Sequence, residues 1–148
     1  MKIWVDADAC PKMIKEILFR AADRTGTKTI FVANQWLQIP ASEHLQFLLV
    51  EQGSDIADDK IAEDCEAGDL IITADIPLAA RVVEKGATAL DPRGKIYNAS
   101  NIKEILSMRD FMDSLRGSGV ETGGPAGFGQ QEKQHFANAL DRFITQSQ

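Results

Sequence analysis

Short apolar runs alternate along this chain with longer segments in which apolar residues recur every three or four positions. The short runs, rich in β-branched and aromatic side chains, predict five strands at residues 2–5, 28–33, 45–50, 69–75 and 87–90. The helical spacing predicts helices over 11–24, 55–68, 76–86 and 101–115. A last amphipathic helix carries Phe136, Leu140, Phe143 and Ile144.

Strands that alternate with helices are typical of a mostly parallel sheet covered on both faces. We therefore expect one α/β domain over residues 1–148, a three-layer α/β/α sandwich with strand order 3-2-1-4-5. The stretch "GSGVETGGPAGFGQQ" at 117–131 holds six of the eleven glycines, so it cannot form a core. A long glycine-rich segment of this kind predicts a functional flap or a linker.

Composition narrows the class of protein. No segment has the roughly 18 apolar residues of a membrane span, and Lys2, Asp6 and Asp8 interrupt any N-terminal signal sequence. Two distant cysteines, Cys10 and Cys65, do not make a disulfide framework, so we expect a reduced, cytoplasmic protein. The net charge of −6 argues against a general nucleic-acid coat. It leaves room for an enzyme that acts on nucleic acid through metal ions and a local basic rim.

Five aspartates occupy corresponding places in the predicted topology. Asp6 and Asp8 follow the first strand, Asp75 ends the fourth, and Asp58 and Asp59 begin the helix that leads into the fourth. If the first and fourth strands are neighbours, all five lie at the carboxyl edge of the sheet, where α/β folds bind ligands. Carboxylates held close together repel one another, and a divalent cation removes that repulsion. Hard oxygen ligands favour Mg²⁺ or Mn²⁺.

Each acid also has a structural interpretation. Asp58 and Asp59 suit the first turn of a helix, Asp75 suits an N-cap, and Asp6 suits an acceptor for backbone amides.

Other residues near this edge are weaker candidates. Arg93, in the turn "DPRGK", is a candidate phosphate ligand, with a solvated turn arginine as the alternative. Cys10 precedes a helix N-terminus, where a nucleophilic thiolate is favoured, although most such cysteines are structural. Asn34 and Trp36 follow the second strand and line the rim or pack.

Four motifs carry a resemblance to a known family: "VDADACP", "DIADDKIAE", "GDLIITADIPLA" and "LDPRG". With the late "GGPAGFG" and "FANALDRF", they are similar to the YaiI/YqxD family of uncharacterised bacterial proteins over essentially the whole chain. That family in turn resembles PIN-like domains, mostly metal-dependent nucleases. The resemblance implies that Asp6 with Asp8, Asp58 or Asp59, and Asp75 take the places of the acidic residues of that fold.

Three functions remain open from the sequence. The first is a Mg²⁺- or Mn²⁺-dependent nuclease or phosphodiesterase acting on RNA or DNA, with Asp6, Asp8 and Asp75 as catalytic residues. The second is a phosphohydrolase of the haloacid-dehalogenase type, with Asp6 as nucleophile and Asp8 as acid. The third is a non-catalytic nucleotide-binding module.

Overall fold

The described residues form a sheet with strand order β3-β2-β1-β4-β5-β6. The computed structural model describes residues 1–53, 55–119 and 127–147. The strands are β1 (Ile3–Asp6), β2 (Thr29–Ala33), β3 (Leu45–Leu49), β4 (Leu70–Ile72), β5 (Thr88–Leu90) and β6 (Ile96–Tyr97). The predicted order of the first five strands is confirmed, and all four pairings among them are parallel.

The sixth strand corrects the prediction of five. β6 pairs antiparallel with β5, and Ala89 lies opposite Tyr97. The turn between them is held by Asp91, whose Oδ1 accepts hydrogen bonds from the Arg93 and Lys95 amides. A strand of two residues carries too little pattern to be predicted.

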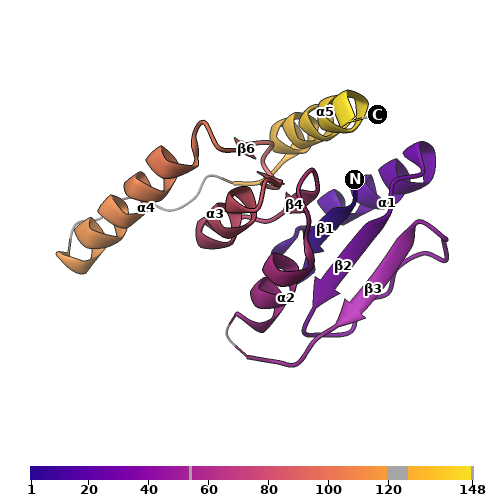
Figure 1. Ribbon diagram of the computed structural model, residues 1–148, viewed down its shortest axis with the longest axis horizontal. Helices are drawn as coiled ribbons and strands as arrows, with labels where there is room; N and C mark the ends of the chain where they lie inside the picture. Colours follow the sequence, from indigo (N-terminus) through magenta and orange to yellow (C-terminus); the bar gives the residue numbers. More distant parts are fainter. Residues whose placement is uncertain (54, 120–126, 148) are drawn as a thin grey trace.

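Five helices accompany the sheet: α1 (Lys12–Thr25), α2 (Ile56–Asp64), α3 (Ile76–Glu84), α4 (Ile102–Gly117) and α5 (Gln130–Ser147). Figure 1 shows α4 extending away from the sheet, whereas α1 and α5 lie together near the other end of the view. The helix predicted over 55–68 ends earlier, at Asp64, and the predicted fourth strand is shortened to β4.

The central strands are buried on both faces because helices cover each side. In β1, Ile3 and Val5 contact one core cluster, which includes residues of α1 and α5, such as Leu18 and Phe136. Trp4, between them, faces the second cluster, with residues of α2 and α3. This alternation follows from the two-residue period of a strand. The structure is thus the three-layer α/β/α arrangement that the sequence predicts.

Asn101 precedes α4, but its side chain makes no capping bond to the helix. Instead, its Nδ2 donates to the Ile96 carbonyl and its Oδ1 accepts from the Asn98 amide, so it ties α4 to β6. Much of the glycine-rich segment, residues 120–126, lies outside the described residues, and the flap prediction stays untested.

The chain crosses the sheet in a way that creates a switch point between β1 and β4. After β1 it proceeds outward through β2 and β3, then returns to place β4 on the other side of β1. Connections leave such a pair of strands in opposite directions, which opens a crevice at their carboxyl ends. Asp6 ends β1 and Thr73 follows β4 at this point.

In the parts of the chain that the structure describes, no helix is long and apolar enough to cross a membrane.

Candidate functional site

Asp6 lies at the switch point because β1 and β4 are in register there. Val5 pairs with Ile72, so Asp6 comes beside Thr73 of the neighbouring chain segment. The Thr73 hydroxyl donates to Asp6 Oδ2 at 3.0 Å. Thr73 is buried and Asp6 is half-buried, so this hydrogen bond holds the carboxylate at the mouth of the crevice.

Asp75 is held by two hydrogen bonds of the loop that leads into α3. Its Oδ1 accepts from the Leu78 amide at 3.0 Å, which makes it the N-cap of that helix. Its own amide donates to Thr73 Oγ1 at 3.0 Å. The structural interpretation of Asp75 is therefore confirmed, and the same bonds place its carboxylate beside Asp6.

Asp58 and Asp59 are adjacent in the first turn of α2 but face different neighbours. The Asp59 carboxylate forms an exposed ion pair with Arg81 of α3, at 2.8 Å. Asp58 instead shares a hydrogen bond with the Asp75 side chain and lies within the field of Asp6. Successive residues on a helix point about 100° apart, so only one of the two can face the crevice.

The three carboxylates Asp6, Asp58 and Asp75 interact electrostatically. Burial raises the pKa of Asp58 to about 7, and the charges of Asp6 and Asp75 contribute to this rise. Burial also raises the pKa of Asp6, with further contributions from Asp75 and Asp8, while the Thr73 hydrogen bond opposes the rise. Arg81 of α3, the ion-pair partner of Asp59, also interacts with the charge of Asp58. The pKa of Asp58 is raised despite this exposed cation.

Asp8 lies at the outer side of the same edge. It belongs to a short 3-10 turn, Ala7–Ala9, and its Oδ2 accepts from the Asn34 amide at 2.8 Å. This bond directs the exposed Asp8 toward the end of β2, although its charge still reaches Asp6. Asn34 therefore contributes its backbone to this edge.

The predicted metal ligands do not form a closed cage. Within residues 1–53, 55–119 and 127–147, no three His, Cys, Asp or Glu side chains gather closely enough to hold a metal ion. Mg²⁺ is typically bound through one or two carboxylates, with waters and substrate phosphates as the other ligands. The chemistry of the donors therefore suits a hard cation, and the metal site itself stays a prediction.

Arg93 lies near the predicted edge, but the chain engages its guanidinium. A cavity of about 220 Å³ is lined by Arg93 together with Ala9 and Ala74, which follow β1 and β4. Arg93 Nη1 donates to the Gly127 carbonyl at 3.2 Å, and its guanidinium lies 5.7 Å from the centre of the Phe128 ring. The arginine thus anchors the segment before α5, and its phosphate-binding role stays a prediction.

Cys10 and Trp36 lie in opposite environments. Cys10 is buried in the core, and burial raises the pKa of its thiol to about 12, so a thiolate nucleophile is disfavoured. Trp36 is 79% exposed and lies 5.4 Å from the Phe47 ring, at the surface rather than in the core.

Thr73 is the important residue of this site that the sequence analysis missed. Its hydroxyl donates to Asp6 and accepts from the Asp75 amide, so one side chain links the ends of β1 and α3. The available signal was its position two residues before Asp75, where a hydroxyl side chain can form a local bond to the backbone.

Comparison with known proteins agrees with the resemblance seen in the motifs. The family described as "Uncharacterized BCR, YaiI/YqxD family" matches residues 4–146. A UPF0178 protein of Syntrophotalea carbinolica is 62% identical over 98% of this chain and 98% of its own length. A UPF0178 protein of Shewanella pealeana is 59% identical over 99% of this chain and 97% of its own length. No solved structure matches the chain. The match over nearly the full length shows that this chain belongs to the YaiI/YqxD family.

Proposed function

We propose that the protein is a divalent-cation-dependent phosphodiesterase, a nuclease, whose active site is the carboxylate group Asp6, Asp58 and Asp75. The single observation that carries the proposal is the pair of hydrogen bonds of Thr73, which join Asp6 at the end of β1 to the loop of Asp75 after β4. Burial and the charges of these two carboxylates raise the pKa of Asp58 to about 7, which supports the proposal. A strongly perturbed carboxyl in the crevice of an α/β sheet is a mark of functional sites. The buried cysteines, both free, fit a reducing, cytoplasmic setting.

The residues have different parts in this proposal. Asp6 and Asp75 are each fixed by hydrogen bonds, from Thr73 and from the Leu78 amide respectively, so they supply two carboxylates at set positions. Asp58 is half-buried and shares a hydrogen bond with Asp75 that requires a proton. A cation held by one or two of these carboxylates, with waters and substrate phosphates as its other ligands, would displace that proton where it binds Asp58, because metal binding needs deprotonated ligands.

The chemistry that suits this arrangement is attack of water on a phosphodiester. Bound Mg²⁺ or Mn²⁺ would lower the pKa of the attacking water and offset the charge of the phosphate. A carboxylate surface alone repels a polyanionic substrate, so the proposal requires the cation for substrate binding as well as for chemistry.

The test is thermal unfolding with and without Mn²⁺, together with cleavage of labelled single-stranded RNA and DNA. At a hundred times its dissociation constant, a ligand of the folded state adds about 2.7 kcal/mol of stability. We expect a clear rise in the melting temperature and cleavage of the polymer for the wild type, with a smaller rise and no cleavage for Asp6→Asn. Asp59→Asn is the matched control, because Asp59 faces Arg81 rather than the crevice.

A wild-type melting temperature that does not change on addition of millimolar Mn²⁺ or Mg²⁺ would refute the cation site. Cation binding without cleavage of either polymer would refute the nuclease. Hydrolysis of a phosphomonoester, together with a fluoroberyllate adduct trapped on Asp6 in a separate experiment, would favour the phosphohydrolase instead.

A further inference from the structure

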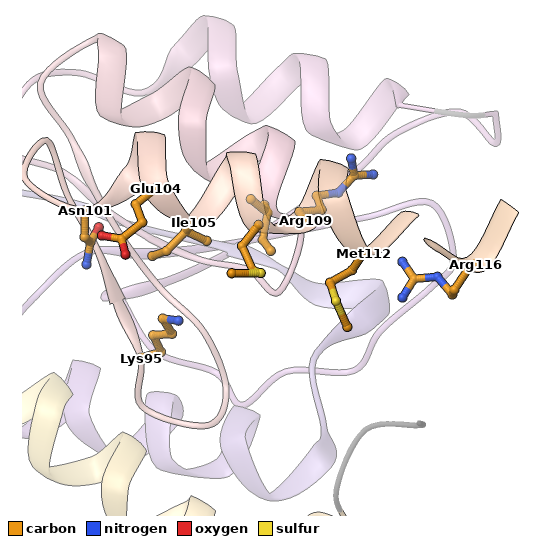
Figure 2. Close-up of a pocket in the computed structure, with 9 residues that line it drawn as sticks. Lys95, Asn101, Glu104, Ile105, Arg109, Met112 and Arg116 are labelled. Atoms are coloured by element: carbon orange, nitrogen blue, oxygen red, sulfur yellow. The ribbon is translucent and has the colours of Figure 1, made fainter. Parts of the chain in front are cut away.

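A large groove runs along α4, next to the carboxylate site but separate from it. Its volume is about 580 Å³, within the range of roughly 300–1,000 Å³ that ligand sites show. One wall is α4, and the other includes Lys95 of the β5–β6 turn and Ile76, the first residue of α3. Figure 2 shows Lys95 rising from the turn toward the side chains of α4.

The floor of this groove is apolar and open to solvent. Met108 and Met112, one helical turn apart on α4, both line it, and Met108 is 58% exposed. Within α4, which the structure describes completely, Ile102 is the one buried residue. Methionine side chains are flexible and make favourable sulfur contacts with flat aromatic rings. The floor therefore suits a planar aromatic group.

The rim of the groove carries three cationic side chains, although the chain has a net charge of −6. Lys95, Arg109 and Arg116 line the groove, against a single acid, Glu104, among its described lining residues. Lys95 forms none of the ion pairs found among the described residues, and its Nζ lies 5.9 Å from the centre of the Tyr97 ring. A concentration of positive charge on one feature of an acidic protein favours an anionic ligand.

The two arginines already form ion pairs within the chain, which weakens but does not prevent their binding to a phosphate. Asp113 of the same helix is an ion-pair partner of both Arg109 and Arg116, and Asp110 is a second partner of Arg109. A guanidinium has five N–H donors, so it can hold a carboxylate and a phosphate together. Competition with Asp113 weakens each contact with a ligand.

The spacing of the cations indicates several phosphates rather than one. Arg109 and Arg116 are seven residues apart on α4, which is about 10 Å along the helix axis at 1.5 Å per residue. Figure 2 shows the Arg109 and Arg116 side chains on different stretches of α4, with Arg109 pointing to the opposite side from Met112. A ligand with one phosphate cannot use both ends of the groove, whereas a polynucleotide places phosphates along its length.

We propose that this groove binds a single-stranded polynucleotide, with bases on Met108 and Met112 and phosphates at Lys95, Arg109 and Arg116. Ile76 connects the two features, because it lines the groove and directly follows Asp75. A strand lying on α4 would thus lead into the carboxylate crevice. The inference rests on the proposed nuclease for its purpose, but strand binding is measurable without cleavage.

The experiment measures binding of a fluorescent single-stranded RNA of about ten nucleotides, a length within the usual site size, by anisotropy in EDTA. We expect Lys95→Gln and Arg116→Gln each to weaken binding about five- to tenfold. Each should also reduce the slope of log affinity against log salt by about 0.7 per lost phosphate contact. Lys103→Gln is the matched control, since Lys103 is on the same helix but lines a different cavity, beside Ala80 and Val83.

Several results would overturn the inference. One is an absence of RNA binding at low salt. Another is an equal loss of RNA affinity in Lys103→Gln. A third is a mononucleotide that competes for the site as well as the strand does. Self-association through α4 that the charge variants leave unchanged would also overturn it. The Asp6→Asn variant separates the two proposals, because it should keep RNA binding in EDTA even if it loses the Mn²⁺ response.

Discussion

Replacing Asp58 by Asn tests the electrostatics of the carboxylate site without any ligand. Asn has nearly the shape of a protonated Asp and can still donate to Asp75, but it cannot ionise. The folded pKa of Asp58 is about 7, against an ordinary value of 3.8. The folded protein therefore binds more protons than the unfolded chain between these two values, and its stability falls as the pH rises through them.

The magnitude follows from the same two values. Each pKa unit corresponds to about 1.36 kcal/mol, so a rise of this size in a fully buried group would be worth about 4 kcal/mol. Asp58 is only half-buried, and screening by solvent reduces the expected effect to about 1–2 kcal/mol. The contribution of neutral Asp58 to the free energy of unfolding is complete below the pKa that this group has in the unfolded chain. It is lost by the time the pH exceeds about 7.

The assay is urea unfolding in EDTA at about pH 4 and about pH 8, the two sides of the transition. At the higher pH, Asp58→Asn should be about 1–2 kcal/mol more stable than the wild type. At the lower pH, the two should be nearly equal. Asp59→Asn should show no such gain, because it removes only a surface ion pair worth about 0–1 kcal/mol. Parallel pH profiles for wild type and Asp58→Asn would refute the electrostatic reasoning.

Two further substitutions test local features of the fold. Asp75→Ala should cost about 0.5–2 kcal/mol in metal-free urea unfolding, through loss of the Leu78 cap, whereas Asp75→Ser should retain most of that stability; equal losses would contradict the capping role. Gly94→Ala should cost at least about 1–3 kcal/mol, because its φ is +95° and an added Cβ would lie 2.7 Å from the His135 backbone carbon. An unchanged denaturation midpoint would contradict that close approach of the β5–β6 turn to α5.

The sequence alone determined the order of the elements and the general place of the acids. The apolar runs at β1, β2 and β4 are continuous because parallel strands are buried on both faces, so their pattern is strong. The rules for connections between strands leave few possible topologies, and strand order 3-2-1-4-5 is one of them. This order places Asp6 and Asp75 at one edge of the sheet.

Tertiary structure decided which of the predicted site residues contact one another. Asp58 and Asp59 are equivalent in sequence pattern. The structure distinguishes them, because Arg81 of α3 forms an ion pair with Asp59. Arg93 follows a strand as predicted, yet packing of the segment before α5 engages its guanidinium. Thr73 reads as an ordinary strand residue until the register of β1 and β4 places it beside Asp6.

The groove along α4 also depends on tertiary structure. The spacing of Met108, Arg109 and Arg116 is visible in the sequence, but Lys95 joins them only because β6 pairs antiparallel with β5 and Asn101 ties α4 to β6. The physical reason is common to all these cases. Periodicity reports whether a residue faces a core, whereas the partner of a polar side chain depends on contacts between segments far apart in the chain.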